Sequence, residues 1–153
     1  PNLEQNSIDE AWLDMTGSEG LFGKPLVAAK RIMDEIKDRL GLWCSIGIAE
    51  NKFLAKMAAE MKKPLGITEL WAADVPVKLW PLAVKEMYGV GPKTAEKMNR
   101  LGIKTIGDLA RCDSNLIVKN FGKGGKEIYL HANGIDHSPV LAHTTDDMKS
   151  IGR

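Results

Sequence analysis

The chain has 153 residues and a formal net charge of +1, and its 44% hydrophobic and 27% charged residues are ordinary globular usage. This composition excludes collagen-like, coiled-coil and disordered chains, and no apolar run reaches the roughly 18 residues that a membrane span needs. The two cysteines have no further Cys or His at ligand spacing, which argues against a zinc site. With no charged-then-apolar leader either, we expect a cytoplasmic protein.

The first half of the chain predicts alternating strands and helices. In order, we expect a strand over 7–15, a helix over 26–40, a strand over 43–49, a helix that Asn51 caps, and a strand over 67–71. The first helix is indicated by apolar residues three and four apart, with Pro25 near its start and Gly41 just past its end. Asn51 is typical of the residue that caps a helix N-terminus.

Strand signals stop at about residue 72, and glycine-rich turns then join short helical pieces. These pieces are expected over 75–80, 84–87, 92–101, 106–110, 115–120 and 125–132. The pattern predicts an α+β fold with two packed units. Residues 1–70 would form part of a ferredoxin-like unit, an antiparallel sheet with two helices, and residues 71–141 a small all-α unit. Residues 142–153 are expected to be a polar linker. We expect Trp12 and Trp43 in the core, and His131, His137 and His143 on the surface.

Two adjacent carboxylates, Asp9 and Glu10, stand inside an otherwise apolar strand. A buried charge is costly unless it is paired or bound to a metal, and Mg²⁺ prefers carboxylate and phosphate oxygens. Neighbours on a regular strand point to opposite faces, so both could reach one ion only where the strand ends or bulges. The residues alone leave open the alternative of an exposed acid pair at an edge or turn.

Basic residues gather in two stretches. Residues 51–63 hold four lysines against one glutamate, and residues 85–130 hold nine Lys or Arg against five acidic residues. Such stretches suit a polyanion bound to one face, although they also keep a surface soluble. Lys52 and Lys56 share one face of the expected helix, and Lys63 follows its end, where a lysine complements the helix dipole or grips a phosphate.

Two glycine-rich turns open helices in the second half. In Gly89-Val90-Gly91-Pro92-Lys93-Thr94, the glycines allow a tight turn, and the free N–H groups of a helix N-terminus could bind a phosphate without reading sequence. A poorer copy recurs in Gly122-Lys123-Gly124-Gly125-Lys126. Together the two turns could contact two phosphates of one nucleic-acid backbone.

Five segments in register resemble the Y-family translesion DNA polymerases, the DNA polymerase IV, UmuC-like and ImpB/MucB/SamB group. The segments are 7–14, 45–58, 63–66, 89–94 and 101–109. Trp12 departs from the tyrosine that the family commonly has at that position. The resemblance implies that residues 1–70 are the C-terminal part of the palm, that 71–141 are the thumb with its helix-hairpin-helix, and that 142–153 lead toward a missing little finger.

The resemblance also implies the site residues. Asp9 and Glu10 match the family's second and third metal-binding carboxylates, which are catalytic, and Lys63 matches a lysine that contacts the triphosphate of the incoming nucleotide. The residues expected to bind the DNA backbone are Gly89, Val90, Gly91, Lys93 and Thr94 of the helix-hairpin-helix, and Gly122, Lys123, Gly124 and Lys126 of a second thumb contact.

The implied activity is that of a DNA-directed DNA polymerase. With two Mg²⁺ ions it transfers nucleotides to a primer 3′-hydroxyl opposite damaged template, and its partners are primer-template DNA and dNTP. The family's first metal-binding aspartate and its fingers have no counterpart here, so the 153-residue chain itself is expected to be inactive. The alternative is a non-catalytic helix-hairpin-helix DNA-binding module, which has no use for Asp9 and Glu10. A further partner that the resemblance leaves open is a sliding clamp, which would bind through regions absent from this chain.

Overall fold

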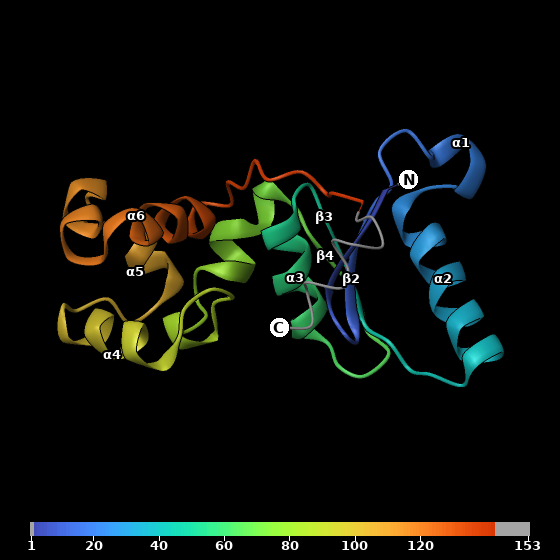
Figure 1. The fold of residues 1–153 in the computed structure, drawn as a ribbon, viewed down its shortest axis with the longest axis horizontal. Helices are drawn as coiled ribbons and strands as arrows, with labels where there is room; N and C mark the ends of the chain where they lie inside the picture. The colour runs from blue at the N-terminus through green and yellow to red at the C-terminus, as the bar shows by residue number, and fades with distance from the viewer. Residues whose placement is uncertain (1, 143–153) are drawn as a thin grey trace.

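The computed structural model describes residues 2–142. The strands lie between helix α2 on one side and, on the other, the helices of residues 72–132, which we name the helical lobe (Figure 1). The first half holds β1 (Asn2–Ser7), β2 (Glu10–Asp14), α1 (Glu19–Phe22), α2 (Pro25–Leu40), β3 (Ile46–Ala49), α3 (Lys52–Met61) and β4 (Ile67–Leu70). The second half holds η1 (Ala72–Asp74), η2 (Val75–Leu79), η3 (Val84–Glu86), α4 (Pro92–Arg100), α5 (Ile106–Ala110) and α6 (Ser114–Ala132). The predicted α+β class is confirmed.

The strand expected over 7–15 is present only over Glu10–Asp14, as β2, because the chain turns at residues 8–9 and an unexpected strand, β1, pairs with it in an antiparallel hairpin. The register pairs Gln5 with Ala11 but Ser7 with Glu10, so Asn6 is the extra residue of a β-bulge. Strand β1 was missed because its sequence, NLEQNS, is almost wholly polar and lacks the apolar alternation that marks a strand.

The expectation of one antiparallel sheet is also wrong in detail. The described strands form two sheets of two strands each, β1 with β2 in antiparallel and β3 with β4 in parallel orientation. A parallel pair needs a crossover connection, and α3 provides it here. The strand expected over 43–49 begins only at Ile46, and Trp43, expected in the core, precedes it and is 66% exposed.

Helix α3 is the centre of the core. The side chain of Asn51 accepts a hydrogen bond from the N–H of Leu54 at 2.9 Å, which confirms the predicted cap. The buried residues of α3 belong to one apolar cluster that continues through β4 into the helical lobe: Phe53, Leu54, Met57, Ala58, Leu70, Leu79, Met98, Ile106, Leu109 and Ile117. The core therefore crosses residue 71, where the sequence changes from strands to helices.

The two helices expected over 115–120 and 125–132 are joined in the single element α6. Gly122 interrupts its helical geometry with φ 71° and ψ −154°, a conformation that favours glycine, so the predicted break is present as a kink.

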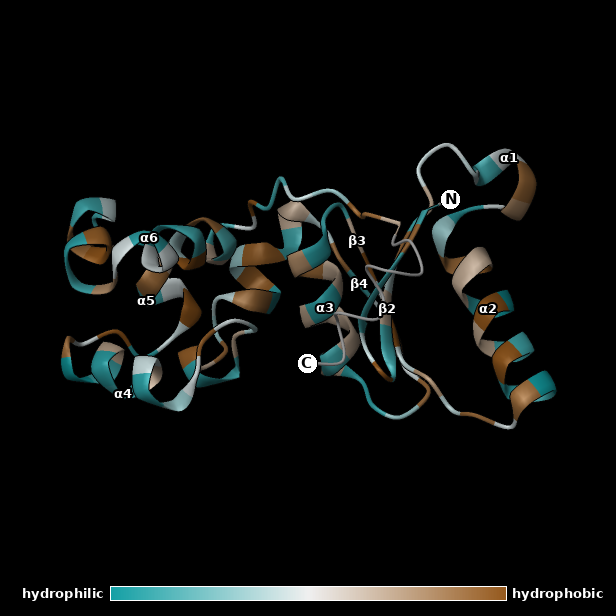
Figure 2. Cartoon of the chain, in the orientation of Figure 1, coloured by the Kyte–Doolittle hydropathy of each residue, from teal (hydrophilic) through white to brown (hydrophobic). Residues whose placement is uncertain are grey.

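Helix α2 lies on the side of the strands opposite α3 (Figure 1). It buries only Ala28, Ala29 and Met33, whereas Leu40 and the following Leu42 are exposed apolar residues. Figure 2 shows this apolar character at the C-terminal end of α2 and in the loop that follows. Within residues 2–142, no helix is both long and apolar enough to cross a membrane.

Gly47 on β3 allows α3 to approach the strand closely. A Cβ atom at this position would collide with the backbone carbonyl of Ala55 and would lie 2.6 Å from the backbone nitrogen of Ala59. Backbone atoms cannot move aside as a flexible side chain can, so Gly47→Ala is expected to lower the free energy of unfolding by about 3 kcal/mol, measured by urea denaturation. The control is Gly20→Ala, where a Cβ meets nothing within 4 Å. Equal stability of the two variants would contradict the close packing.

Candidate functional site

The predicted carboxylates lie at the tip of the β1–β2 hairpin. Asp9 is in the turn and exposed, and Glu10 is the first residue of β2. The regular strand therefore ends between them, which meets the condition under which neighbouring carboxylates could turn toward one ion. The Oγ of Ser7 donates a hydrogen bond to Oδ1 of Asp9 at 3.0 Å, which ties the turn to the end of β1.

Glu10 begins a row of alternating charges that ends at Lys63. Lys56 Nζ lies 2.6 Å from Oε2 of Glu10 and 2.9 Å from Oε1 of Glu60, and Lys63 Nζ lies 3.1 Å from the same Glu60 oxygen. The structure thus brings the predicted carboxylate and the predicted triphosphate-binding lysine together, through two residues of α3. Lys56 was noticed in the sequence only as one of two lysines on a helical face, and Glu60 was missed.

Lys56 and Glu60 perturb each other's ionisation. Burial alone would lower the pKa of Lys56, but the hydrogen bonds and charges of Glu10 and Glu60 together raise that pKa above its ordinary value of 10.5. The hydrogen bond from Lys56 in turn lowers the pKa of Glu60 below its ordinary value of 4.5. The ammonium group of Lys56 therefore stays charged at neutral pH, between two carboxylates.

These side chains line one open groove. Its volume is about 1850 Å³, and its walls come from the β1–β2 hairpin, α2, β3 and α3. Asp9, Glu10, Lys56 and Lys63 all contribute to the lining. Small-molecule pockets usually have volumes of roughly 300–1000 Å³, so this groove could accept a larger ligand.

The residues present fit part of a divalent-cation site. Asp9 and Glu10 supply the oxygen donors that such ions prefer, and Asp9 is open to solvent. Over the described residues 2–142, however, no three His, Cys, Asp or Glu side chains lie close enough together to hold an ion. An ion bound here would need further oxygen ligands, from phosphates or from carboxylates outside this set.

The predicted phosphate-binding turn opens α4. Gly89 has φ 95°, which favours glycine, and Gly91 caps the helix with Pro92 in its first turn. Gly91 has no side chain that could accept hydrogen bonds from the first N–H groups of α4, so these groups are not capped by it. Lys93 is exposed, whereas the side chain of Val90 is buried, so at Val90 only the backbone could take part in binding.

The second predicted contact lies at the kink of α6. Gly122, Lys123, Gly124 and Lys126 are all exposed there. Lys97 on α4 donates a hydrogen bond to the carbonyl of Asn120 and lies 4.9 Å from the ring of Phe121. Lys97, which the sequence analysis did not single out, therefore connects α4 with the kink.

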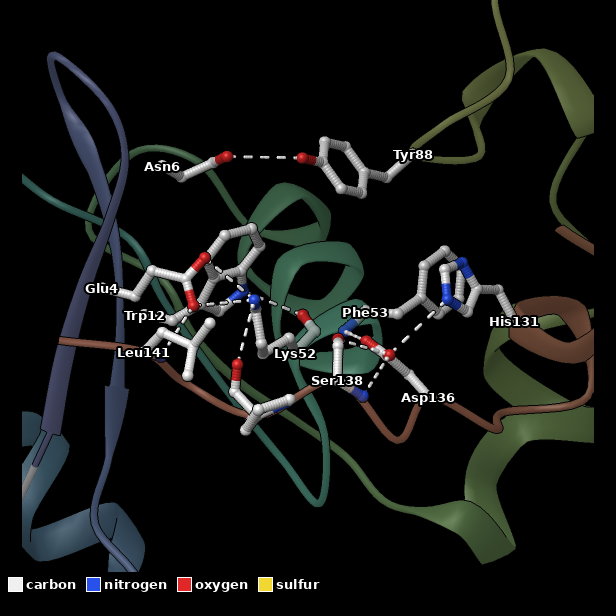
Figure 3. A network of polar contacts seen from close by, with 11 residues as sticks. Glu4, Asn6, Trp12, Lys52, Phe53, Tyr88, His131, Asp136, Ser138 and Leu141 are labelled. Atoms are coloured by element: carbon white, nitrogen blue, oxygen red, sulfur yellow. Dashed lines mark hydrogen bonds and ion pairs between the residues drawn. The ribbon is translucent and has the colours of Figure 1, made fainter. Parts of the chain in front are cut away.

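Residues 134–141 run back from α6 to the N-terminus of α3, and we name them the return segment (Figure 3). Oδ2 of Asp136 accepts a hydrogen bond from the N–H of Phe53 at 3.0 Å. Nδ2 of Asn51 donates to the carbonyl of Gly134 at 2.9 Å. The segment thus satisfies polar groups at the start of α3, and no pattern in the sequence indicated it.

Lys52 joins the return segment to the hairpin (Figure 3). Its Nζ lies 2.8 Å from Oε1 of Glu4 on β1, and the two side chains are each only 14% exposed. It also donates to the carbonyl of Pro139 at 3.3 Å and lies 4.6 Å from the ring centroid of Trp12. The N–H of Leu141 donates to Oε1 of Glu4 at 2.9 Å, so one carboxylate holds both partners.

His131, expected on the surface, is a half-buried residue that stacks on Phe53 with ring centroids 4.6 Å apart. Its Nε2 lies 3.7 Å from Oδ1 of Asp136. His137 is exposed as expected, and His143 lies outside the described residues.

The chain is similar to known proteins over its whole length. Residues 1–60 match the impB/mucB/samB family, and residues 72–103 match the IMS family HHH motif, which includes the turn before α4. The chain is 63% identical over 153 residues to a DNA polymerase IV of Alkaliphilus oremlandii, and 49% identical over 150 residues to DNA polymerase IV 1 of Bacillus subtilis. All of this chain aligns with the first protein and 98% with the second.

Solved structures give the same result. A Y-family DNA polymerase chimera of Dbh and Dpo4 superposes on 94% of this chain, with a TM-score of 0.82 and 32% identity. The chain belongs to the Y family of DNA polymerases. A second Y-family structure, DinB from Sulfolobus solfataricus, covers 91% of the chain with a TM-score of 0.77 and 32% identity. The chain spans 38% and 36% of the lengths of the two bacterial relatives, and 42% and 41% of these two structures.

Loss of Lys52 should weaken the fold. Lys52→Met leaves the carboxylate of Glu4 without the ammonium in a nearly buried position, so we expect the free energy of unfolding to fall by about 2 kcal/mol in urea denaturation. The matched control is Lys30→Met, because Lys30 forms an exposed pair with Asp34 that contributes less than about 1 kcal/mol. If the free energy of unfolding falls equally little in both variants, Lys52 does not fasten the hairpin.

Asp136 should make stability depend on pH. Burial alone would raise the pKa of Asp136, but hydrogen bonds from Ser138 and from the N–H of Phe53, with the charge of His131, together lower it below its ordinary value of 3.8. A group with a lowered folded-state pKa stabilises the protein above its unfolded pKa, and this contribution is lost as pH falls through the folded value. Asp136→Asn should therefore be less stable than wild type at pH 7, and the difference should shrink below about pH 3.8 in thermal unfolding. A difference that is constant from pH 7 to pH 2 would contradict this role.

Proposed function

We propose that the protein that contains this chain is a DNA-directed DNA polymerase for translesion synthesis, which extends a primer opposite damaged template. The observation that carries this proposal is the charged row from Glu10 through Lys56 and Glu60 to Lys63, which runs along one groove. The relatives named DNA polymerase IV support it. A module that only binds DNA has no use for such a row.

The carboxylates and lysines of the groove would have different roles in this reaction. Asp9 and Glu10 would be ligands of divalent cations, Mg²⁺ in our proposal, and Lys63 would bind the triphosphate of the incoming dNTP. When bound, such ions supply activation of the 3′-hydroxyl and neutralisation of the departing pyrophosphate. Lys56 holds Oε2 of Glu10 and fixes where that carboxylate lies.

Primer-template DNA and dNTP are the proposed partners. One structural neighbour is titled a Dbh ternary complex with partially disordered substrates, and another a post-insertion binary complex of Dbh DNA polymerase. In this chain, the turn before α4 would hold the backbone of the primer strand, and the kink of α6 would hold a second phosphate. We further propose that residues 1–70 act as part of a palm and 71–141 as a thumb, in a cytoplasmic protein of DNA damage tolerance.

The test is primer extension by the full-length protein that contains this chain. Asp9→Ala and Glu10→Ala should each reduce nucleotide addition by about 100-fold or more, because each removes a ligand of an ion that stabilises the transition state. The affinity for primer-template DNA, measured by fluorescence anisotropy, should remain nearly unchanged. Glu35→Ala is the control, since Glu35 is an exposed carboxylate of α2.

Two outcomes would contradict the proposal. Normal turnover in either Asp9→Ala or Glu10→Ala would show that the cation assignment is wrong. A wild-type protein that binds duplex DNA but adds no nucleotide would instead favour the non-catalytic helix-hairpin-helix module.

A further inference from the structure

Asn6 holds Glu10 from the side opposite Lys56. As the extra residue of the β-bulge, Asn6 lies outside the regular register of β1 with β2, and bulges commonly redirect a side chain beside a functional site. Its Nδ2 donates a hydrogen bond to Oε1 of Glu10 at 3.0 Å, while Lys56 donates to Oε2 at 2.6 Å. Each oxygen of the Glu10 carboxylate therefore has its own donor.

The other end of the Asn6 amide faces Tyr88, which comes from the helical lobe (Figure 3). The hydroxyl of Tyr88 donates to Oδ1 of Asn6 at 3.4 Å, a long hydrogen bond. The Tyr88 ring is placed by two further contacts, an edge-on contact with Trp12 at 6.4 Å and the ammonium of Lys56 at 5.6 Å from its centroid. Tyr88 thus contacts the residues that hold Glu10 on both sides.

Tyr88 is also the residue directly before the turn that opens α4. Its backbone N–H contacts Sδ of Met57, a buried residue of α3, at 3.3 Å, and Gly89 follows with φ 95°. The backbone at Tyr88 is therefore anchored to α3, one residue away from the turn that would hold a nucleic-acid phosphate. Two side chains, Tyr88 and Asn6, therefore connect that turn to the carboxylate of Glu10.

We propose that Tyr88 and Asn6 are a positioning pair that couples the DNA-holding turn to the carboxylate of Glu10. The position of the turn sets the position of the Tyr88 hydroxyl, which orients the Asn6 amide, and the amide orients Glu10. Both residues would act on the reaction through Glu10. The inference rests on the proposed polymerase function and names two residues that adjust its site.

The Tyr88 ring could instead serve only to pack against Trp12, and Tyr88→Phe separates the two roles because it keeps the ring and removes the hydroxyl. In the full-length protein, the nucleotide addition rate in single-turnover primer extension should fall about 2- to 10-fold, as expected for the loss of one hydrogen bond. The dissociation constants for primer-template DNA and for dNTP should stay unchanged. Tyr129→Phe, which alters the other tyrosine of the 153-residue chain, is the matched control and should keep the wild-type rate.

Two further measurements test the coupling itself. Asn6→Ala should lower the rate to a similar extent, and the double variant should be no slower than the slower single variant, because both changes break one chain of contacts. Mn²⁺ titrated into the protein–DNA–dNTP complex and followed by electron paramagnetic resonance should bind more weakly to Tyr88→Phe than to Tyr129→Phe. Thermal unfolding of Tyr88→Phe should match that of the control.

The outcomes separate this inference from the proposed function. If the wild type extends primers and Tyr88→Phe matches Tyr129→Phe in rate and Mn²⁺ binding, the positioning pair is wrong and the polymerase assignment stands. The same conclusion follows if Tyr88→Phe weakens DNA binding and leaves the rate intact, or if the two single effects multiply. If the wild type extends no primer, the proposed function fails and the positioning pair fails with it.

Discussion

Two lysines one helical turn apart fasten the β1–β2 hairpin to α3, with Lys52 on Glu4 and Lys56 on Glu10. Among the described strands, the hairpin shares no ladder with β3 and β4, so side chains must fix where its tip lies. The indole of Trp12 adds a hydrogen bond to the carbonyl of Lys52 at 2.9 Å. A partly buried ion pair is costly to break, because the partner that remains is left in a poorly hydrated place. The position of the candidate carboxylates therefore depends on charges carried by one helix.

Helix α3 can fix the position of the hairpin because several other elements hold α3 itself in place. Gly47 lets it lie directly against β3, and its buried face continues into the core of the helical lobe. The return segment satisfies its N-terminus through Asp136. Lys52 and Lys56, on the face of α3 toward the hairpin, thus project from an element held in place, and fixed placement is what a site that orients charged groups needs.

The sequence predicted the elements whose signals are local. Helices α2, α3, α4 and α5 have apolar periodicity and recognisable caps, and all were found close to their expected bounds. Strand β1 was missed because its sequence is polar, although its partner β2 follows directly. The parallel pairing of β3 with β4 and the return segment were missed because each depends on partners distant in the chain. In the site, too, local contacts could be predicted and contacts between distant residues could not. The i, i+4 spacing of Lys56 and Glu60 is visible in the sequence, whereas the contacts of Glu10 with Lys56 and of Asn6 with Tyr88 join residues 46 and 82 positions apart. His131 and Trp43 were misplaced because residue type alone does not fix burial.

The return segment also brings the C-terminal end of the described chain back to its N-terminal hairpin. The N–H of Leu141 donates to Glu4 on β1, a residue 137 positions earlier in the chain. The same carboxylate of Glu4 also binds Lys52 at the start of α3. The hairpin, the start of α3 and the end of the return segment are therefore fastened together at one side chain.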